Sequence, residues 1–94
     1  MRLIEQQMNN AIHNQEMWWS KDNTMVTYCS GDNTSHVRLH GHHIASYNHG
    51  TGITTPNLIT LAEWPTNTTK SRLRALGVNV TTLKGVTYIA GVEV

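Results

Sequence analysis

Covalent cross-links and membrane-spanning runs are both missing from this sequence. Its one cysteine, Cys29, excludes an intramolecular disulfide and a C-x-x-C redox or metal site. No apolar run approaches the roughly 18 to 20 residues that cross a bilayer, and the N-terminal MRLIEQQMNN has too short an apolar region for a signal peptide. We therefore expect no membrane partner and a location in a reducing cytoplasm.

Charge of either sign is also scarce. Seven Lys and Arg stand against six Asp and Glu, for a formal charge of +1, which excludes a polycation that holds nucleic acid by charge alone. Three basic and five acidic residues give −2 over residues 1–64, whereas four basic and one acidic residue give +3 over residues 65–94. The C-terminal third is therefore mildly basic.

The length of 94 residues predicts one domain over residues 1–94, because domains usually run from about 50 to 250 residues. A chain of this size buries only roughly two thirds of its unfolded surface, so its stability is modest unless a partner or self-association adds to it.

Residues 2–16 are predicted to form a helix, since apolar side chains recur on one stripe while the other face, with Glu5, is polar. SKDN at residues 20–23 then breaks the pattern. Trp18 and Trp19 follow the helix, and two adjacent indoles cannot both lie at the centre of one stripe. We expect one of them to stay partly exposed as an interface anchor, and Trp19 is the candidate.

From Thr24 onwards the period is two, which is typical of strands, over MVTYCS, SHVRLH, HIASYN and NLITLAEW. A second helix is predicted after Pro65, with capping oxygens on the residues that follow, and ends at Gly77. Residues 78–94 form a hairpin that turns at a Lys-Gly pair. The predicted fold is α+β: an N-terminal helix, an antiparallel meander of three or four strands, a second helix and a C-terminal β-hairpin, with the helices on one sheet face.

Three blocks carry a resemblance to a known family. They are M-R-x-I-E at the N-terminus, V-x-L-H-G-x-x-I-A in the centre and W-P-T-N-T-T-K-S-R-L-R-A-L after it. They resemble a family of small tailed-bacteriophage proteins with an L-H-G-N-x-I-A hairpin and a W-x-x-x-T-T-x-x-R-L-x-A-L helix. This chain departs from the pattern at His42, where asparagine is usual. The resemblance implies a phage origin and the host-cell cytoplasm, and it transfers no catalytic residue.

HGHH at residues 40–43 leaves two hairpin registers open. If Gly41 and His42 are the central residues of a type II′ turn, Leu39 sits opposite Ile44. The face away from the core then carries His36, Arg38, His40, His43, Ala45 and Tyr47. If the turn is His40-Gly41 instead, His42 joins the apolar face.

On the first register, His40 and His43 are cross-strand neighbours with Cβ atoms about 5 Å apart, close enough for one metal ion. A third ligand could come from His36, Asp32 or His49. A zinc site usually needs three or four supported ligands, and no H-E-x-x-H spacing is present. We therefore predict a solvated face with no metal and no cofactor, with metal binding and pH sensing as the alternatives.

No catalytic set is recognisable. Cys29 lies inside a predicted strand, the carboxylates are scattered, and neither GDNT nor HGTG matches a phosphate-binding loop. We therefore predict that the protein is not an enzyme.

The second helix carries the basic residues. At about 100° per residue, Lys70 and Arg74 share one flank of its apolar stripe and Arg72 lies on the other. These side chains suit phosphate contacts, and the free N–H groups at the helix start suit an anion. The plainer interpretation is a solvated surface whose long side chains cover apolar neighbours.

The sequence thus favours a non-enzymatic accessory protein that binds a host or phage macromolecule, with a protein partner favoured and self-association included. The alternatives are nucleic-acid binding by the second helix and Arg38, and histidine-dependent metal binding. The candidate binding residues are Lys70, Arg72, Arg74, Arg38, His36, His40, His43 and Trp19.

Overall fold

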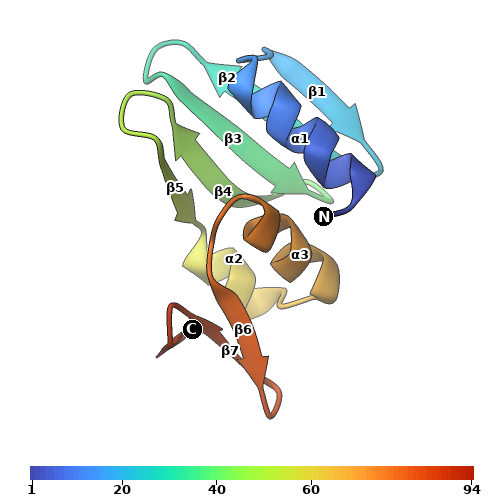
Figure 1. Ribbon diagram of the computed structural model, residues 1–94, viewed down its shortest axis with the longest axis vertical. Coiled ribbons are helices and arrows are strands. Elements are labelled where there is room, and N and C mark those ends of the chain that lie inside the picture. The colour runs from blue at the N-terminus through green and yellow to red at the C-terminus, as the bar shows by residue number, and fades with distance from the viewer.

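The computed structural model describes residues 1–94 as helices and strands in two sheets (Figure 1). The helices are α1 (Leu3–His13), α2 (Leu58–Glu63) and α3 (Asn67–Ala75). The strands are β1 (Trp18–Lys21), β2 (Thr24–Cys29), β3 (Thr34–Leu39), β4 (His42–Asn48), β5 (Ile53–Pro56), β6 (Val80–Leu83), β7 (Val86–Ile89) and β8 (Val92–Glu93). The predicted α+β class, with its antiparallel meander and C-terminal hairpin, is confirmed.

Strands β1 to β5 form a sheet in sequence order, and β6 to β8 form a second, smaller sheet. Four of the turns between strands have two central residues with positive φ. They are Asp22-Asn23, His40-Gly41, Lys84-Gly85 and Ala90-Gly91. Positive φ at both positions is the signature of the type I′ turn, whose twist matches that of paired strands. The meander is therefore built from local turns.

One face of the larger sheet is covered and the other is open. Helix α1 lies across the covered face, and α3 packs beside it (Figure 1). Met8 of α1, Val26 of β2, Val37 of β3 and Leu73 of α3 are at most 1% exposed and form the centre of the core. No helix is long and apolar enough to span a membrane.

Two predicted elements are wrong. NLITLAEW, taken for a strand, contains α2, because the Asn57 side chain accepts a hydrogen bond from the Thr60 N–H and starts a helical turn. The N-terminal helix ends at His13 rather than at residue 16, since Gln15 has a φ of 52°. The two tryptophans that follow therefore lie in a strand, β1, that the sequence did not indicate.

The hairpin at HGHH adopts the second of the two registers. Leu39 pairs with His42, so the expected Leu39–Ile44 pairing is wrong. A bulge then places both Ile44 and Ala45 in the core, where they are 1% and 0% exposed. Ala45 and Tyr47 consequently face the core side rather than the outer face, and His40 lies in the turn.

Candidate functional site

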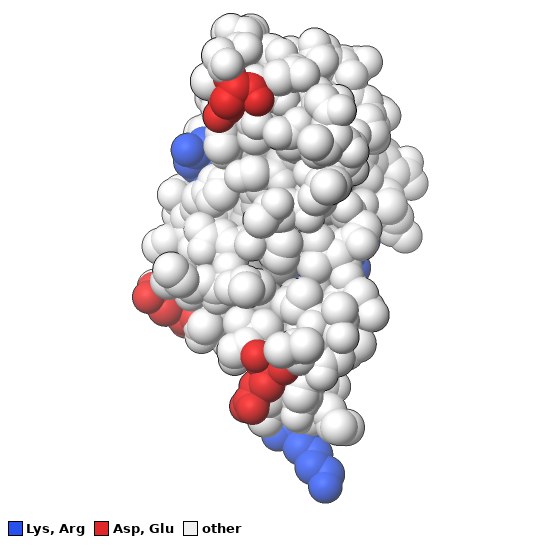
Figure 2. Space-filling view, turned by 90° about the vertical axis from the view of Figure 1, so that its left-hand side faces the viewer, with Lys and Arg blue, Asp and Glu red and all other residues white.

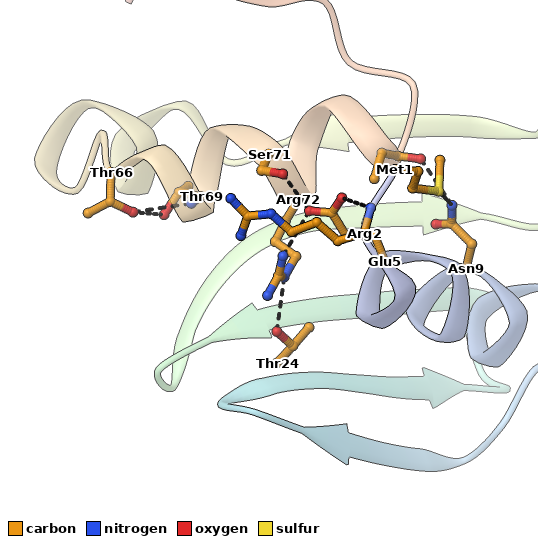
Figure 3. A network of polar contacts seen from close by, with 10 residues as sticks. Met1, Arg2, Glu5, Asn9, Thr24, Thr66, Thr69, Ser71 and Arg72 are labelled. Carbon is orange, nitrogen blue, oxygen red and sulfur yellow. Dashed lines mark hydrogen bonds and ion pairs between the residues drawn. The ribbon is translucent and has the colours of Figure 1, made fainter.

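The basic residue Arg72 points into the molecule rather than to solvent. Its Nη1 donates to the Glu5 carboxylate of α1 at 2.8 Å, and its Nε donates to the Thr24 hydroxyl of β2 at 3.1 Å (Figure 3). The Ser71 hydroxyl also donates to Glu5, at 2.6 Å. Arg72 therefore joins α3 to α1 and the sheet. The prediction that its side chain lies on an exposed flank of the helix is wrong.

Glu5 is the buried partner that the sequence did not single out. Burial alone would raise the pKa of Glu5, but hydrogen bonds from Ser71, Arg72 and the Arg2 N–H, with the Arg72 charge, lower that pKa overall. The carboxylate therefore stays ionised inside the protein. Its sequence signal was weak, because a lone Glu on a helix face usually reaches water.

Lys70 and Arg74 attach the second sheet to α3. Lys70, which is 6% exposed, donates through Nζ to the Thr82 hydroxyl at 2.6 Å. Arg74 is exposed but donates through Nε to the Val80 carbonyl at 2.8 Å. Two of the three basic residues of α3, Lys70 and Arg72, are thus buried, and no continuous basic surface forms on this helix.

The histidines that do come together are His36 and His43, on the open face of the sheet. His36 Nδ1 lies 3.2 Å from His43 Nε2, and the Ser46 hydroxyl lies 3.2 Å and 3.0 Å from these two atoms. Arg38 is opposite His43 and donates to the Thr27 hydroxyl at 3.2 Å. The predicted His40–His43 neighbour pair is wrong, because it required the other register.

Asn57 determines which nitrogen of His43 carries the proton. The Asn57 Oδ1 accepts from the Thr60 N–H at 3.1 Å, so its Nδ2 faces His43 Nδ1, also at 3.1 Å. An amide nitrogen only donates, and His43 Nδ1 must therefore accept. The neutral imidazole then carries its proton on Nε2, facing His36 and Ser46.

This tautomer opposes two kinds of chemistry. A general base for Ser46 needs an unprotonated Nε2, and a metal ion on Nε2 would move the proton to Nδ1, against the Asn57 amide hydrogens. No three His, Cys, Asp or Glu side chains gather as metal ligands. Burial, followed by the charges of His36 and Arg38, lowers the pKa of His43, so its neutral form is favoured.

Trp18 is the more exposed indole of the Trp pair. Trp18 is 63% exposed on the open face, whereas Trp19 packs against the core, because neighbours in a strand point to opposite faces. A second exposed indole, Trp64, is 49% exposed and stacks on His42 with ring centroids 5.0 Å apart. Trp18 is therefore the more exposed of the pair, and the role of the half-buried Trp19 as an interface anchor stays a prediction.

The most apolar hollow of the surface lies between α2 and the C-terminal strands. We call it the α2 cleft; its volume is about 440 Å³, and its walls are Leu58, Ile59, Ala62, Ile89, Val92, Glu93 and Val94. Leu58, Ile59 and Val92 are 51%, 74% and 69% exposed. The sequence carries one signal of this site, the helical spacing of Leu58, Leu61 and Ala62, but the run also alternates as a strand does and was predicted to be one.

One acidic side chain lines the α2 cleft, and a second lies on α2 next to the face that forms its wall. Glu93 lines it, and Glu63 lies on α2 about 40° around the helix from Ile59. Figure 2 faces the side with β5, the start of α2 and the C-terminal strands, and it shows few, separate charged groups on an otherwise uncharged surface. The cleft is therefore apolar inside, with acidic groups at or near its edge.

Comparison with known proteins places the chain among bacteriophage proteins. The model of a family described as Kyanoviridae Gp96 protein matches residues 1–93. This match confirms the resemblance to a phage family that the three sequence blocks indicated. No curated protein and no solved structure matches the chain.

Proposed function

The chain belongs to the Kyanoviridae Gp96 family of bacteriophage proteins, and we propose that it is a non-enzymatic accessory protein that binds another protein through the α2 cleft. The observation that carries the proposal is the exposure of Leu58, Ile59 and Val92 around one hollow. Apolar patches that face water in this way commonly mark interaction sites.

The energetics favour a protein partner. Burying a Leu, Ile or Val side chain fully is worth about 1.5 to 3 kcal/mol, and the three residues are each at least half exposed in the free protein. A partner that covers them gains a few kcal/mol from these side chains alone. The cleft therefore offers the apolar centre that protein interfaces need.

The alternatives have less support. Nucleic-acid binding relied on the basic residues of α3, and Arg72 and Lys70 are instead committed to Glu5 and Thr82. Metal binding and catalysis relied on the histidines, and the Asn57 contact gives His43 the wrong tautomer for both. Protein binding through the apolar side chains of the cleft is better supported, because all the residues that it needs are exposed.

Cross-linking in infected cells tests the proposal. Ile59→Asp and Val92→Asp place a charge in the cleft, and Leu3→Asp is a matched control at an apolar residue that is 65% exposed on α1. We expect a stoichiometric protein partner to be cross-linked to the unaltered chain and to Leu3→Asp, and to be lost from both cleft variants. Equal cross-linking of one partner by all four proteins would refute the proposal.

A further inference from the structure

The α2 cleft is elongated. A second hollow, of about 260 Å³, shares Ala62, Glu93 and Val94 with it and continues along α2 towards Pro65 and Val86. The contacts of the second sheet with the rest of the molecule are concentrated between β6 and α3, which leaves this side of α2 uncovered. An elongated segment of a partner protein fits such a shape better than a compact small molecule.

A helix fits the cleft better than an added strand. Edge strands recruit a partner strand through a row of free backbone groups, but β8 at the edge of the small sheet has only two residues. The walls of the cleft are side chains: Leu58, Ile59 and Ala62 on one side and Ile89 and Val92 on the other. Such walls receive the apolar stripe of an amphipathic helix.

The acidic groups near the cleft indicate what charge the partner helix carries. The protein contains one ion pair, that of Glu5 with Arg72. Glu93, which lines the cleft, and Glu63, on the neighbouring face of α2, therefore have no basic partner within the chain. Both residues are exposed. Lys84 lies at the tip of the β6–β7 hairpin, beyond the far end of the cleft. An incoming segment therefore meets acidic groups next to the apolar walls.

Resting on the proposed function, we infer that the partner presents an amphipathic helix whose apolar stripe is flanked by Lys or Arg. The stripe contacts Leu58, Ile59 and Val92, and the flanking cations face Glu63 and Glu93. The carboxylates exclude acidic helices of similar hydrophobicity, since like charges oppose each other at a partly dehydrated interface. The acidic residues thus select among helices that the apolar walls alone would accept.

Two synthetic peptides test this inference with the full-length protein. Both carry the same Leu stripe at i, i+3, i+4 and i+7, and they differ only in whether Lys or Glu flanks it. Their dissociation constants are measured by fluorescence anisotropy with and without added salt. We expect the Lys peptide to bind more tightly, and salt to weaken its binding.

Protein variants separate the roles of the two kinds of residue. Glu63→Gln with Glu93→Gln should weaken the Lys peptide by roughly twofold to thirtyfold, as for two exposed ion pairs, and Lys84→Gln should not weaken it. Ile59→Asp should abolish binding, whereas Leu3→Asp should leave it unchanged. Circular dichroism of each variant checks that it is folded.

Equal affinity of the two peptides, lost for both in Ile59→Asp, would overturn the selection of a basic helix and leave the proposed function standing. Failure of both peptides would also overturn it. In that case, self-association of the unaltered protein that Ile59→Asp abolishes would identify a second copy as the occupant. The proposed function itself is decided by the cross-linking in infected cells.

Discussion

Breaking the buried ion pair between Glu5 and Arg72 should strongly destabilise the protein. The two side chains are 3% and 5% exposed and 2.8 Å apart. Arg72→Met removes the cation at similar volume and leaves the Glu5 carboxylate buried without its charged partner. Removing one member of such a pair costs about 3 to 5 kcal/mol. Because domains are stable by only about 5 to 15 kcal/mol, this change should remove a large part of the stability.

A double-mutant cycle measures the coupling directly. Urea unfolding, followed by tryptophan fluorescence, is compared for Glu5→Met, Arg72→Met and the double variant. The double variant should lose much less stability than the sum of the two single losses, because it leaves no unpaired charge. As a control, Glu63→Gln at the exposed end of α2 should change the free energy of unfolding by less than about 0.5 kcal/mol. Additive losses, or a loss below about 1 kcal/mol for Arg72→Met, would refute this reasoning.

Three further predictions concern the histidines. The lowered pKa of His43 means that the unfolded chain takes up a proton near pH 6.5 while the folded protein does so only at lower pH. Stability should therefore be full above pH 6.5 and fall as the pH drops from there to the lowered pKa, and His43→Gln should flatten that part of a urea-unfolding profile. Asn57→Ala should cost about 1 kcal/mol through loss of the α2 cap. Nitrogen NMR of the unaltered protein above pH 6.5 should show His43 protonated on Nε2; a proton on Nδ1 would contradict the role given to Asn57. His40→Asn should raise the free energy of unfolding by up to about 1 kcal/mol, because asparagine tolerates the positive φ of this exposed turn residue better than histidine does. A lower melting temperature of the variant would contradict this prediction.

The parts of the fold that were predictable depend on neighbours in sequence. Helix α3 begins after the N-cap Thr66 and ends before Gly77, which has a positive φ. Both residues lie within one turn of a helix end, so the sequence alone indicates them. The alternation of β2, β3 and β4 is likewise local. NLITLAEW was misassigned because a six-residue apolar segment satisfies both periods, and the Asn57 cap decided between them.

The candidate sites were less predictable, because their residues are brought together from distant parts of the chain. Arg72 and Glu5 are 67 positions apart, and only their packing turns two ordinary surface charges into a buried pair. The position of the turn at His40-Gly41 decided which histidines meet, since the sequence left two registers open and only one of them pairs His43 with Arg38. The α2 cleft needed both the helical form of α2 and the position of the second sheet.

The sequence by itself determined the α+β class of the protein, its antiparallel meander with a C-terminal hairpin, and its phage family. These follow from local backbone preferences, from the spacing of apolar residues and from motifs that can be recognised without a structure. The tertiary structure decided which polar groups are exposed. A charge on a helix face or a histidine on a strand binds, titrates or supports the core according to what packs against it, and that contact lies far away in the sequence.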